Sequence, residues 1–217
     1  MHQHVGPAAQ QRAPVGAVRS VVTDYVNLAG RETEGLDFGV EYRLPRTSFG
    51  QGTLRGDAGY LLTADTQADA GAPIVNNINR DGRTRFRGNI GGTWRVGRWT
   101  AGWITYYYGT YVDTGASTTQ EIYDVLGRPG YISSYVDSGG VRRFRYLVSA
   151  YATHSAYMNY SFPAKRGSLL SDTSVRFRVS NLSDAEPPLA DEDSGYRRGA
   201  GTNPRGRVFE AQVSRRF

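Results

Sequence analysis

His154 and Ser155 are neighbours of the residue types that act as general base and nucleophile in hydrolases. For catalysis, the serine and histidine must converge on one another, and a carboxylate must orient the imidazole. Adjacent side chains of a β-strand point to opposite faces, and His154 falls in phase with an alternating series of alanine and methionine residues. We therefore predict that the sheet separates the two side chains, that there is no catalytic site, and that the protein is not an enzyme.

The acidic run Asp191-Glu192-Asp193 offers carboxylates, which are the ligands that calcium prefers. A calcium site requires about six to eight converging oxygens, and no metal-binding loop motif accompanies this run. A solvated acidic loop is the favoured interpretation, and we predict neither a metal nor a cofactor.

Arginine supplies every cationic residue except Lys165, and the formal net charge is +6. A nucleic-acid-binding protein concentrates its cations on one face or in a basic run. Here the arginines are spread along the chain, one or two in each expected strand. This distribution argues against nucleic acid as a partner.

The elements that carry these residues are predicted to be β-strands. The 217-residue chain has 27 glycines, 15 tyrosines, no cysteine and a mean hydropathy of −0.51. It lacks an apolar run of about 18 residues, which excludes a membrane-spanning helix. The strands of a membrane barrel expose only alternate side chains to lipid and are hydrophilic on average, so alternation is the informative test.

Alternation with a period of two is clear where Leu36, Phe38 and Val40 are interleaved with Asp37 and Glu41. Residues 1–17 lack such periodicity and are predicted to be a disordered lead-in, whereas residues 18–217 are predicted to form barrel strands. The eight expected strands are 18–29, 35–44, 53–63, 85–96, 98–112, 145–162, 174–182 and 207–217.

The expected strands are longer than the five or six residues, roughly, that are typical of soluble sheets. Short and long connections also alternate, which is the rule for membrane barrels with short periplasmic turns and long outer loops. A short connection at 29–33, on the outer side, is an exception. This alternation predicts an antiparallel up-and-down barrel segment whose C-terminus lies on the periplasmic side. The short connections are 45–49, 97 and 163–168, and the long ones are 64–82, 113–144 and 183–204.

The polar faces of these strands are expected to line the lumen, where cross-strand ion pairs neutralise one another or contact a plug. Aromatic residues gather at strand ends as two interfacial girdles, with Trp94, Trp99 and Trp103 at one end. Tyr106, Tyr107, Tyr108 and Tyr111 form the other girdle. A soluble β-sandwich with aromatic-rich strands is the alternative. The residues predicted to face the lumen are Asp37, Glu41, Arg43, Arg55, Asp57, Arg85, Arg87 and Arg95.

The segment 207–217 resembles the terminal strand of outer-membrane barrels, which ends on an aromatic residue preceded by alternating apolar side chains. The matching residues are Phe209, Ala211, Val213 and Phe217, whereas Arg215 departs from the pattern. The resemblance implies that this strand is the signal that the outer-membrane assembly machinery reads.

Three further stretches resemble TonB-dependent receptors in particular. They are Tyr25-Val26-Asn27 with the following Gly30 and Gly35-Leu36-Asp37; Val179 to Asp184 with the following Glu186-Pro187-Pro188; and the Tyr-rich strand that ends at Tyr108 to Asp113. The resemblance implies a barrel of about twenty-two strands around an N-terminal plug. It also implies a TonB-binding segment within the plug part, which this chain lacks.

The resemblance implies the C-terminal barrel part of a receptor in the bacterial outer membrane that takes up a scarce nutrient and is inactive alone. The absence of a signal peptide from 1–17 points to a true start upstream. The expected partners are outer-membrane lipid, the assembly machinery and, through the plug, TonB. A complete eight-stranded barrel with a structural, adhesive or porin-like role is the alternative. Loops 64–82 and 113–144 are expected to face the substrate.

Overall fold

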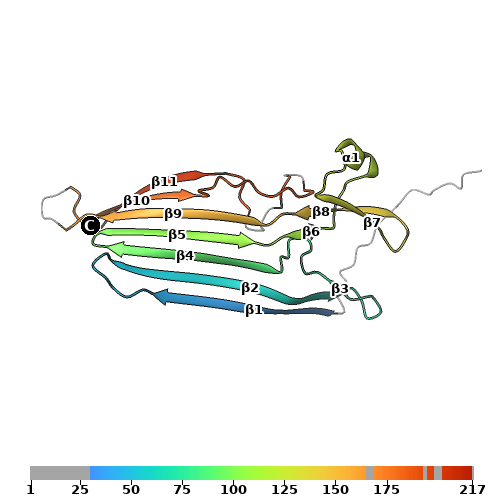
Figure 1. Ribbon diagram of the computed structural model, residues 1–217, viewed down its shortest axis with the longest axis horizontal. Helices are drawn as coiled ribbons and strands as arrows, with labels where there is room; N and C mark the ends of the chain where they lie inside the picture. Colours follow the sequence, from blue (N-terminus) through green and yellow to red (C-terminus); the bar gives the residue numbers. More distant parts are fainter. Residues whose placement is uncertain (1–29, 165–168, 193–194, 198–201, 217) are drawn as a thin grey trace, which may run out of the picture.

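Figure 1 shows a computed structural model of the chain, which describes residues 30–164, 169–192, 195–197 and 202–216. A long antiparallel sheet dominates it, and each strand lies beside the next long strand along the chain. This up-and-down order confirms the predicted all-β class. Within the described residues the sheet is open, with β1 and β11 at its edges. The strands, in spatial order, are β1 (Gly30–Arg43), β2 (Gln51–Gln67), β4 (Phe86–Val96), β5 (Trp99–Tyr108), β9 (Tyr151–Ser161), β10 (Thr173–Ser180) and β11 (Val208–Arg215), and β3 (Val75–Asn76) pairs with the far end of β2.

The observed strands match five of the predicted ones closely, at 35–44, 53–63, 85–96, 174–182 and 207–217. The predicted strand 18–29 lies outside the described residues. The predicted connection at 29–33 is wrong, because Gly30 already pairs with Gln67 at the start of β1. Consecutive polar residues from Arg31 to Glu34 blur the alternation there, so the pattern alone did not predict that β1 begins at Gly30.

The two longest predicted strands, 98–112 and 145–162, are each broken in two. The β5–β9 ladder ends where Tyr108 pairs with Tyr151, and a second ladder starts in the same register where Tyr111 pairs with Val148. The two neighbouring strands therefore leave the main sheet at the same position along their length and stay paired with each other beyond it. The break coincides with the Gly109-Thr110 step, where Gly109 donates its backbone N–H to the Phe86 carbonyl of β4 at 3.0 Å.

The second ladder belongs to a small sheet in the order β6 (Tyr111–Asp113), β8 (Arg142–Val148) and β7 (Ile132–Val136). The connection between β6 and β7 also holds the short helix α1 (Gln120–Val125), whose N-cap Thr119 accepts a hydrogen bond from the Ile122 N–H. Figure 1 shows this unit projecting past one end of the main sheet. Among the described residues, no helix has the length and apolar character needed to cross a membrane.

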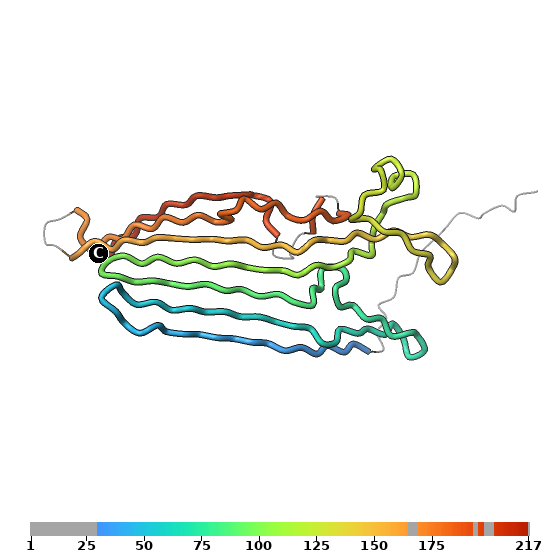
Figure 2. Tube along the Cα trace, viewed as in Figure 1, coloured from blue at the N-terminus to red at the C-terminus, as the bar shows by residue number. Residues whose placement is uncertain are grey.

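The connections differ sharply between the two ends of the main sheet, as the trace in Figure 2 shows. Connections 44–50 and 97–98, and the described residues 162–164 and 169–172, lie at one end, which we call the turn end. The longer connections lie at the opposite end, which we call the loop end. The tightest turn joins Val96 to Trp99, and its Gly97 has a φ of 55°, a left-handed conformation that glycine adopts without strain.

Buried apolar side chains are few and lie toward the loop end. Tyr111, Val148 and Ala190 form one buried cluster, which joins β6, β8 and the last long connection. Ile132 and Phe144 are also buried, in the small sheet. Among the described residues, the main sheet has no comparable buried cluster, and most of its large apolar side chains are exposed.

Candidate functional site

Strand pairing divides the main sheet into two chemically different faces. Leu36 pairs with Tyr60 and Phe38 with Ala58, and the same side continues across the neighbouring strands. We call it the apolar face. Its large side chains stay exposed in the structure, for example Phe38 at 60% and Phe209 at 63%, because no second layer covers them. Its larger members are Leu36, Phe38, Val40, Tyr42, Leu54, Ile90, Trp94, Trp99, Trp103, Met158, Phe177, Phe209 and Val213.

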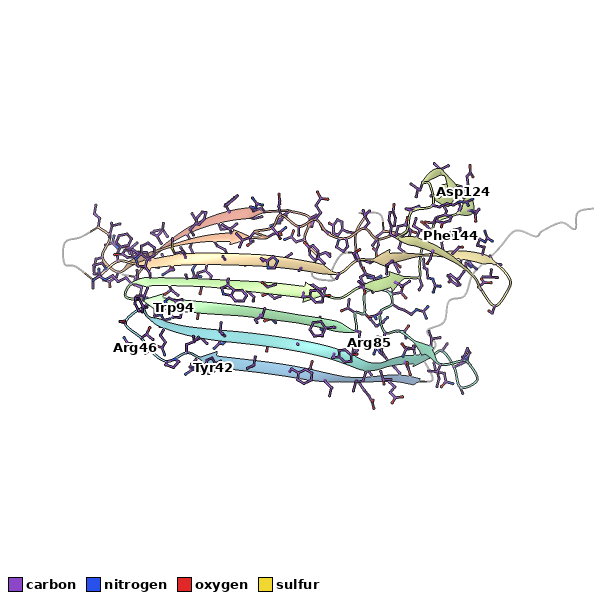
Figure 3. The ribbon with its side chains drawn as sticks, in the orientation of Figure 1. Tyr42, Arg46, Arg85, Trp94, Asp124 and Phe144 are labelled. Carbon is purple, nitrogen blue, oxygen red and sulfur yellow. The ribbon has the colours of Figure 1, made fainter. Side chains whose placement is uncertain are left out.

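The opposite, polar face carries seven of the eight residues predicted to line the lumen: Asp37, Glu41, Arg43, Arg55, Asp57, Arg87 and Arg95. Arg85 departs from this arrangement. It precedes β4, and its guanidinium lies 5.7 Å from the ring centroid of Tyr60, a residue of the apolar face. Figure 3 labels Arg85 near the loop end and Trp94 near the turn end.

Three of these polar-face residues form a compact ion-pair group. Glu41 Oε2 lies 2.8 Å from Arg55 Nη2 across the β1–β2 pair, and Glu41 Oε1 lies 2.9 Å from Arg43 Nε along the strand. Arg178 and Glu210 make a looser pair at 3.8 Å between β10 and β11. In the described part of the chain, Asp37, Asp57, Arg87 and Arg95 make no ion pair.

The sheet curves around its polar face. Side chains from β2 to β10 line a single groove of about 570 Å³, in which Arg55 and Asp57 of β2 lie opposite Arg176 and Arg178 of β10. Strands so far apart in one sheet can line one groove only if the sheet bends toward that side. The charged face is therefore concave, and the apolar face is the outer, convex one.

A separate cavity of about 490 Å³ lies on the polar face at the loop end, and we take it as the candidate functional site. Asp37, Arg87 and Tyr108 of the main strands form one wall. Connection 181–207 closes it from the other side with Pro188, Arg197 and Thr202. Further lining residues include Gly59, Gly82, Arg83, Thr84, Tyr111 and Tyr151.

Residues 79–85, which precede β4 and include Arg83, are held by several local hydrogen bonds. The Asn79 side-chain oxygen accepts from the Arg85 N–H at 2.7 Å, and the Arg83 N–H donates to the Arg80 carbonyl at 2.9 Å. The Asp81 carboxylate accepts from the Thr114 N–H at 2.8 Å and from its hydroxyl at 3.0 Å. These contacts lock the connection before β4 to the chain that follows β6.

The last connection is anchored at its start and its end. The Asn181 side chain accepts from the Ala185 N–H and donates to the Ala185 carbonyl, both at 2.9 Å. Asp184 accepts from the Arg207 N–H at 2.7 Å, so the two ends of the connection are held together. Asn181 and Asp184 have φ values of 52° and 54°, which Asn and Asp tolerate better than most residues.

The acidic run that was considered as a metal site holds this connection in place. Asp191 accepts hydrogen bonds from the N–H and hydroxyl of Ser117, which lies before α1. Glu192 pairs with Arg197 at 3.7 Å. Asp193 lies outside the described residues. Within the described ranges, no group of three or more acidic, histidine or cysteine residues is placed to hold a metal ion.

Burial raises the pKa of Tyr111 to about 12, so this phenol is neutral and can donate a hydrogen bond at physiological pH. Tyr111 is 4% exposed and belongs to the buried cluster beside the cavity. The arrangement can bind a small ligand through guanidinium groups and hydroxyls held on well-packed elements.

Sequence reasoning located this site only in part. Of loops 64–82 and 113–144, which were predicted to face the substrate, only Gly82 lines the cavity among the described residues. The other lining residues come from the main strands, from Arg83 and Thr84 just before β4, from β6 and the chain between β5 and β6, from the chain between β8 and β9, and from connection 181–207. The sequence does show two arginines, Arg197 and Arg198, shortly after the acidic run, but nothing in it indicates that this connection folds across the sheet.

The turn-end aromatic residues are arranged as predicted, but the loop-end group is not. Trp94, Trp99 and Trp103 all lie on the apolar face, and Trp94 donates to the Phe49 carbonyl at 2.9 Å. Tyr106 and Tyr108 lie on the polar face because they have the opposite strand parity to Tyr107, and Tyr111 is buried in the small sheet. The aromatic residues on the apolar face at the loop end are Tyr60, Phe86 and Tyr107.

His154 and Ser155 are on opposite faces of β9. His154 pairs with Thr105, and its Nδ1 lies 2.8 Å from the Thr105 hydroxyl oxygen. Ser155 pairs with Ile104 and lines the polar groove. The two side chains therefore do not converge.

Long antiparallel strands, a convex apolar face without a covering layer and a concave charged face together define a wall of a membrane β-barrel. The family model described as "TonB dependent receptor-like, beta-barrel" matches residues 6–182, and the chain belongs to this family. This confirms the predicted family, whose members are receptors and transporters of the bacterial outer membrane rather than enzymes. Searches of curated proteins and of solved structures gave no match.

Proposed function

We propose that this chain forms the C-terminal part of the barrel wall of a TonB-dependent receptor, in the bacterial outer membrane, that takes up a scarce nutrient. The apolar face lies against lipid, and the polar face lines the lumen. The observation that carries the proposal is the contrast between these faces: large apolar residues such as Ile90, 53% exposed, lie opposite the Glu41–Arg55 ion pair. Lipid accounts for such exposure, whereas water disfavours it.

The open edges support a place within a larger barrel. In the described sheet, β1 and β11 each have only one neighbouring strand. Hydrogen-bonding groups along their free sides cannot be satisfied in hydrocarbon, so a spanning sheet must close. Further strands, to a total of about twenty-two, close it in the proposed receptor. The isolated chain is accordingly expected not to transport anything.

The proposed partners follow from this orientation. Asp57 and Arg95 of the polar face, which make no ion pair with a described residue, are available to a plug inside the lumen, through which TonB acts. The assembly machinery reads the C-terminal strand, in which Phe209, Ala211 and Val213 share the apolar face. Phe217, the last residue of the proposed signal, lies outside the described residues. The turn end, where β11 finishes, faces the periplasm.

A complete eight-stranded barrel is the second candidate, and long strands with alternating connections also suit it. It requires the first and last strands to pair. The described β1 and β11 do not pair with each other, and the predicted first strand, 18–29, lies outside the described residues. The match of the receptor family model to residues 6–182 favours the receptor.

Translation of the genomic DNA upstream of codon 1 tests the proposal directly. We expect a plug domain and about fourteen further strands in the same reading frame. A signal peptide alone, or no continuous reading frame, would favour the small barrel. As a second arm, cells that express only the 217 residues behind an export signal should show no substrate uptake. Restored uptake in those cells would contradict the receptor-part proposal.

A further inference from the structure

The cavity at the loop end holds more positive than negative charge. Its lining includes three guanidinium groups, of Arg83, Arg87 and Arg197, and one carboxylate, of Asp37. Arg197 has an acidic partner, Glu192, at 3.7 Å. Arg83 and Arg87 make no ion pair with any residue that the structure describes. Within the described residues, two of the three cations that line this cavity therefore have no ion-pair partner.

Asp37 does not fill that role, although it is close. A Cβ atom placed on Gly59 would lie 3.1 Å from Asp37 Oδ1 and 3.9 Å from Arg87 Nε, so both side chains flank Gly59 of β2. They make no ion pair with each other, and both side chains line the cavity.

The rest of the lining suits an anion with an apolar or ring-shaped body. Thr84, 9% exposed, supplies a hydroxyl group from a well-packed position. Tyr151, 5% exposed, also lines the cavity, and its hydroxyl donates to the Ala185 carbonyl at 3.3 Å. Tyr108 and Tyr111 add aromatic walls. The volume of about 490 Å³ falls within the range of about 300–1,000 Å³ that is typical of small-molecule sites.

We propose that this cavity recognises the transported substrate through its carboxylate or phosphate groups, so that the substrate is a small oxyanion. The inference rests on the proposed function and deepens it. A guanidinium presents paired N–H donors that match the two oxygens of a carboxylate or phosphate, and such charge-assisted bonds are strong. In a cavity with low-dielectric walls, unpaired cations also raise the local concentration of anions.

The test uses outer membranes from cells that produce the full receptor, with citrate and inorganic pyrophosphate as oxyanion probes and sucrose as the uncharged control. Phenylglyoxal modifies accessible arginines, and mass spectrometry reports the modification rate at each one. We expect either oxyanion, at matched ionic strength, to slow modification of Arg83 and Arg87 while Arg95 is unaffected. Arg95 is the internal control because it is also unpaired on the polar face, but at the turn end.

Equilibrium binding of the radiolabelled probes provides the second readout. The double variant Arg83→Gln/Arg87→Gln should bind the protecting oxyanion at least about tenfold more weakly, whereas Arg95→Gln should bind it normally. Protection by citrate alone or by pyrophosphate alone supports the proposal and identifies the carboxylate or the phosphate as the recognised group. Equal protection by sucrose, equal protection of Arg95, or no protection by either oxyanion would overturn it.

The two proposals fail separately in this design. A strain that lacks the receptor gene but retains all nutrient uptake would refute the receptor function. The binding and protection results do not depend on uptake, so they decide the oxyanion inference by themselves.

Discussion

Arginine placed on either side of one strand should reveal which face of the sheet meets lipid. Ile90 of β4 is 53% exposed on the apolar face, and its neighbour Asn89 points to the polar face. We expect Ile90→Arg to destabilise the folded barrel strongly and Asn89→Arg to have little effect. The two variants add the same side chain at adjacent positions of the same strand, so each controls for the other.

The magnitude follows from the position of Ile90 along the strand. β4 runs from Phe86 to Val96, and with a rise of about 3.4 Å per residue and a tilt of about 40° it covers about 25 Å along the membrane normal. Ile90 then lies about 10 Å from the loop-end boundary, close to the midplane. An arginine facing lipid at that depth costs about 2–4 kcal/mol, whereas an arginine in the lumen costs less than about 1 kcal/mol.

The free energy of unfolding can be measured by guanidinium titration of the full receptor in phosphatidylcholine vesicles. Tryptophan fluorescence reports the transition, since Trp94, Trp99 and Trp103 all lie on the apolar face of this chain. Equal, small losses of stability in Ile90→Arg and Asn89→Arg would refute the orientation, because a sheet with both faces in water treats the two positions alike. A larger loss in Asn89→Arg would reverse the assignment of the faces.

Two further predictions concern packing and the candidate site. Gly102→Ala should lower the free energy of unfolding by about 1–3 kcal/mol, because the new Cβ would lie 2.5 Å from the Tyr157 ring. In the same guanidinium titration, the control Gly56→Ala should be nearly neutral, since the closest contact of its new Cβ is 3.5 Å. Equal effects of the two substitutions would contradict the packing argument. Asp81→Ala removes the acceptor of both Thr114 hydrogen bonds and should cost about 1–3 kcal/mol locally. Faster limited proteolysis near Thr114 would reveal this, whereas an unchanged cleavage rate would show that the contact does not hold the two connections together.

The fold class was predictable because alternation is a local property. In β1, the series through Leu36, Phe38 and Val40 requires one face to be apolar whatever the rest of the chain does. The positions of the tight turns at 45–49 and 97 follow in the same way, whereas strand lengths do not, since 98–112 and 145–162 are each broken in two. Gly97 is an example, since a two-residue turn needs a residue that tolerates positive φ.

The candidate site was predictable only in its strand residues. Asp37 and Arg87 could be assigned to one face from parity, and the structure places both in the cavity wall. The contributions of Arg197 and Thr202 depend on how connection 181–207 folds back. That path is set by distant contacts, such as Asp191 with Ser117, and no local pattern encodes them. The same reason explains the break at Gly109, where a single bond to Phe86 redirects the chain.

The distribution of buried residues connects the proposed membrane wall with the proposed oxyanion cavity. Within the described main sheet, apolar side chains such as Phe38 and Phe209 have no second layer to pack against, and in the proposed orientation lipid supplies the apolar environment that a core supplies in a soluble protein. In that orientation the chain leaves the membrane at the loop end, and there it packs its own core around Tyr111 and Val148. The candidate cavity lies against that core, with Tyr111 in both. Its arginines are therefore held on the best-packed part of the described chain, which gives a fixed geometry to oxyanion recognition without requiring the ligand to order the loops.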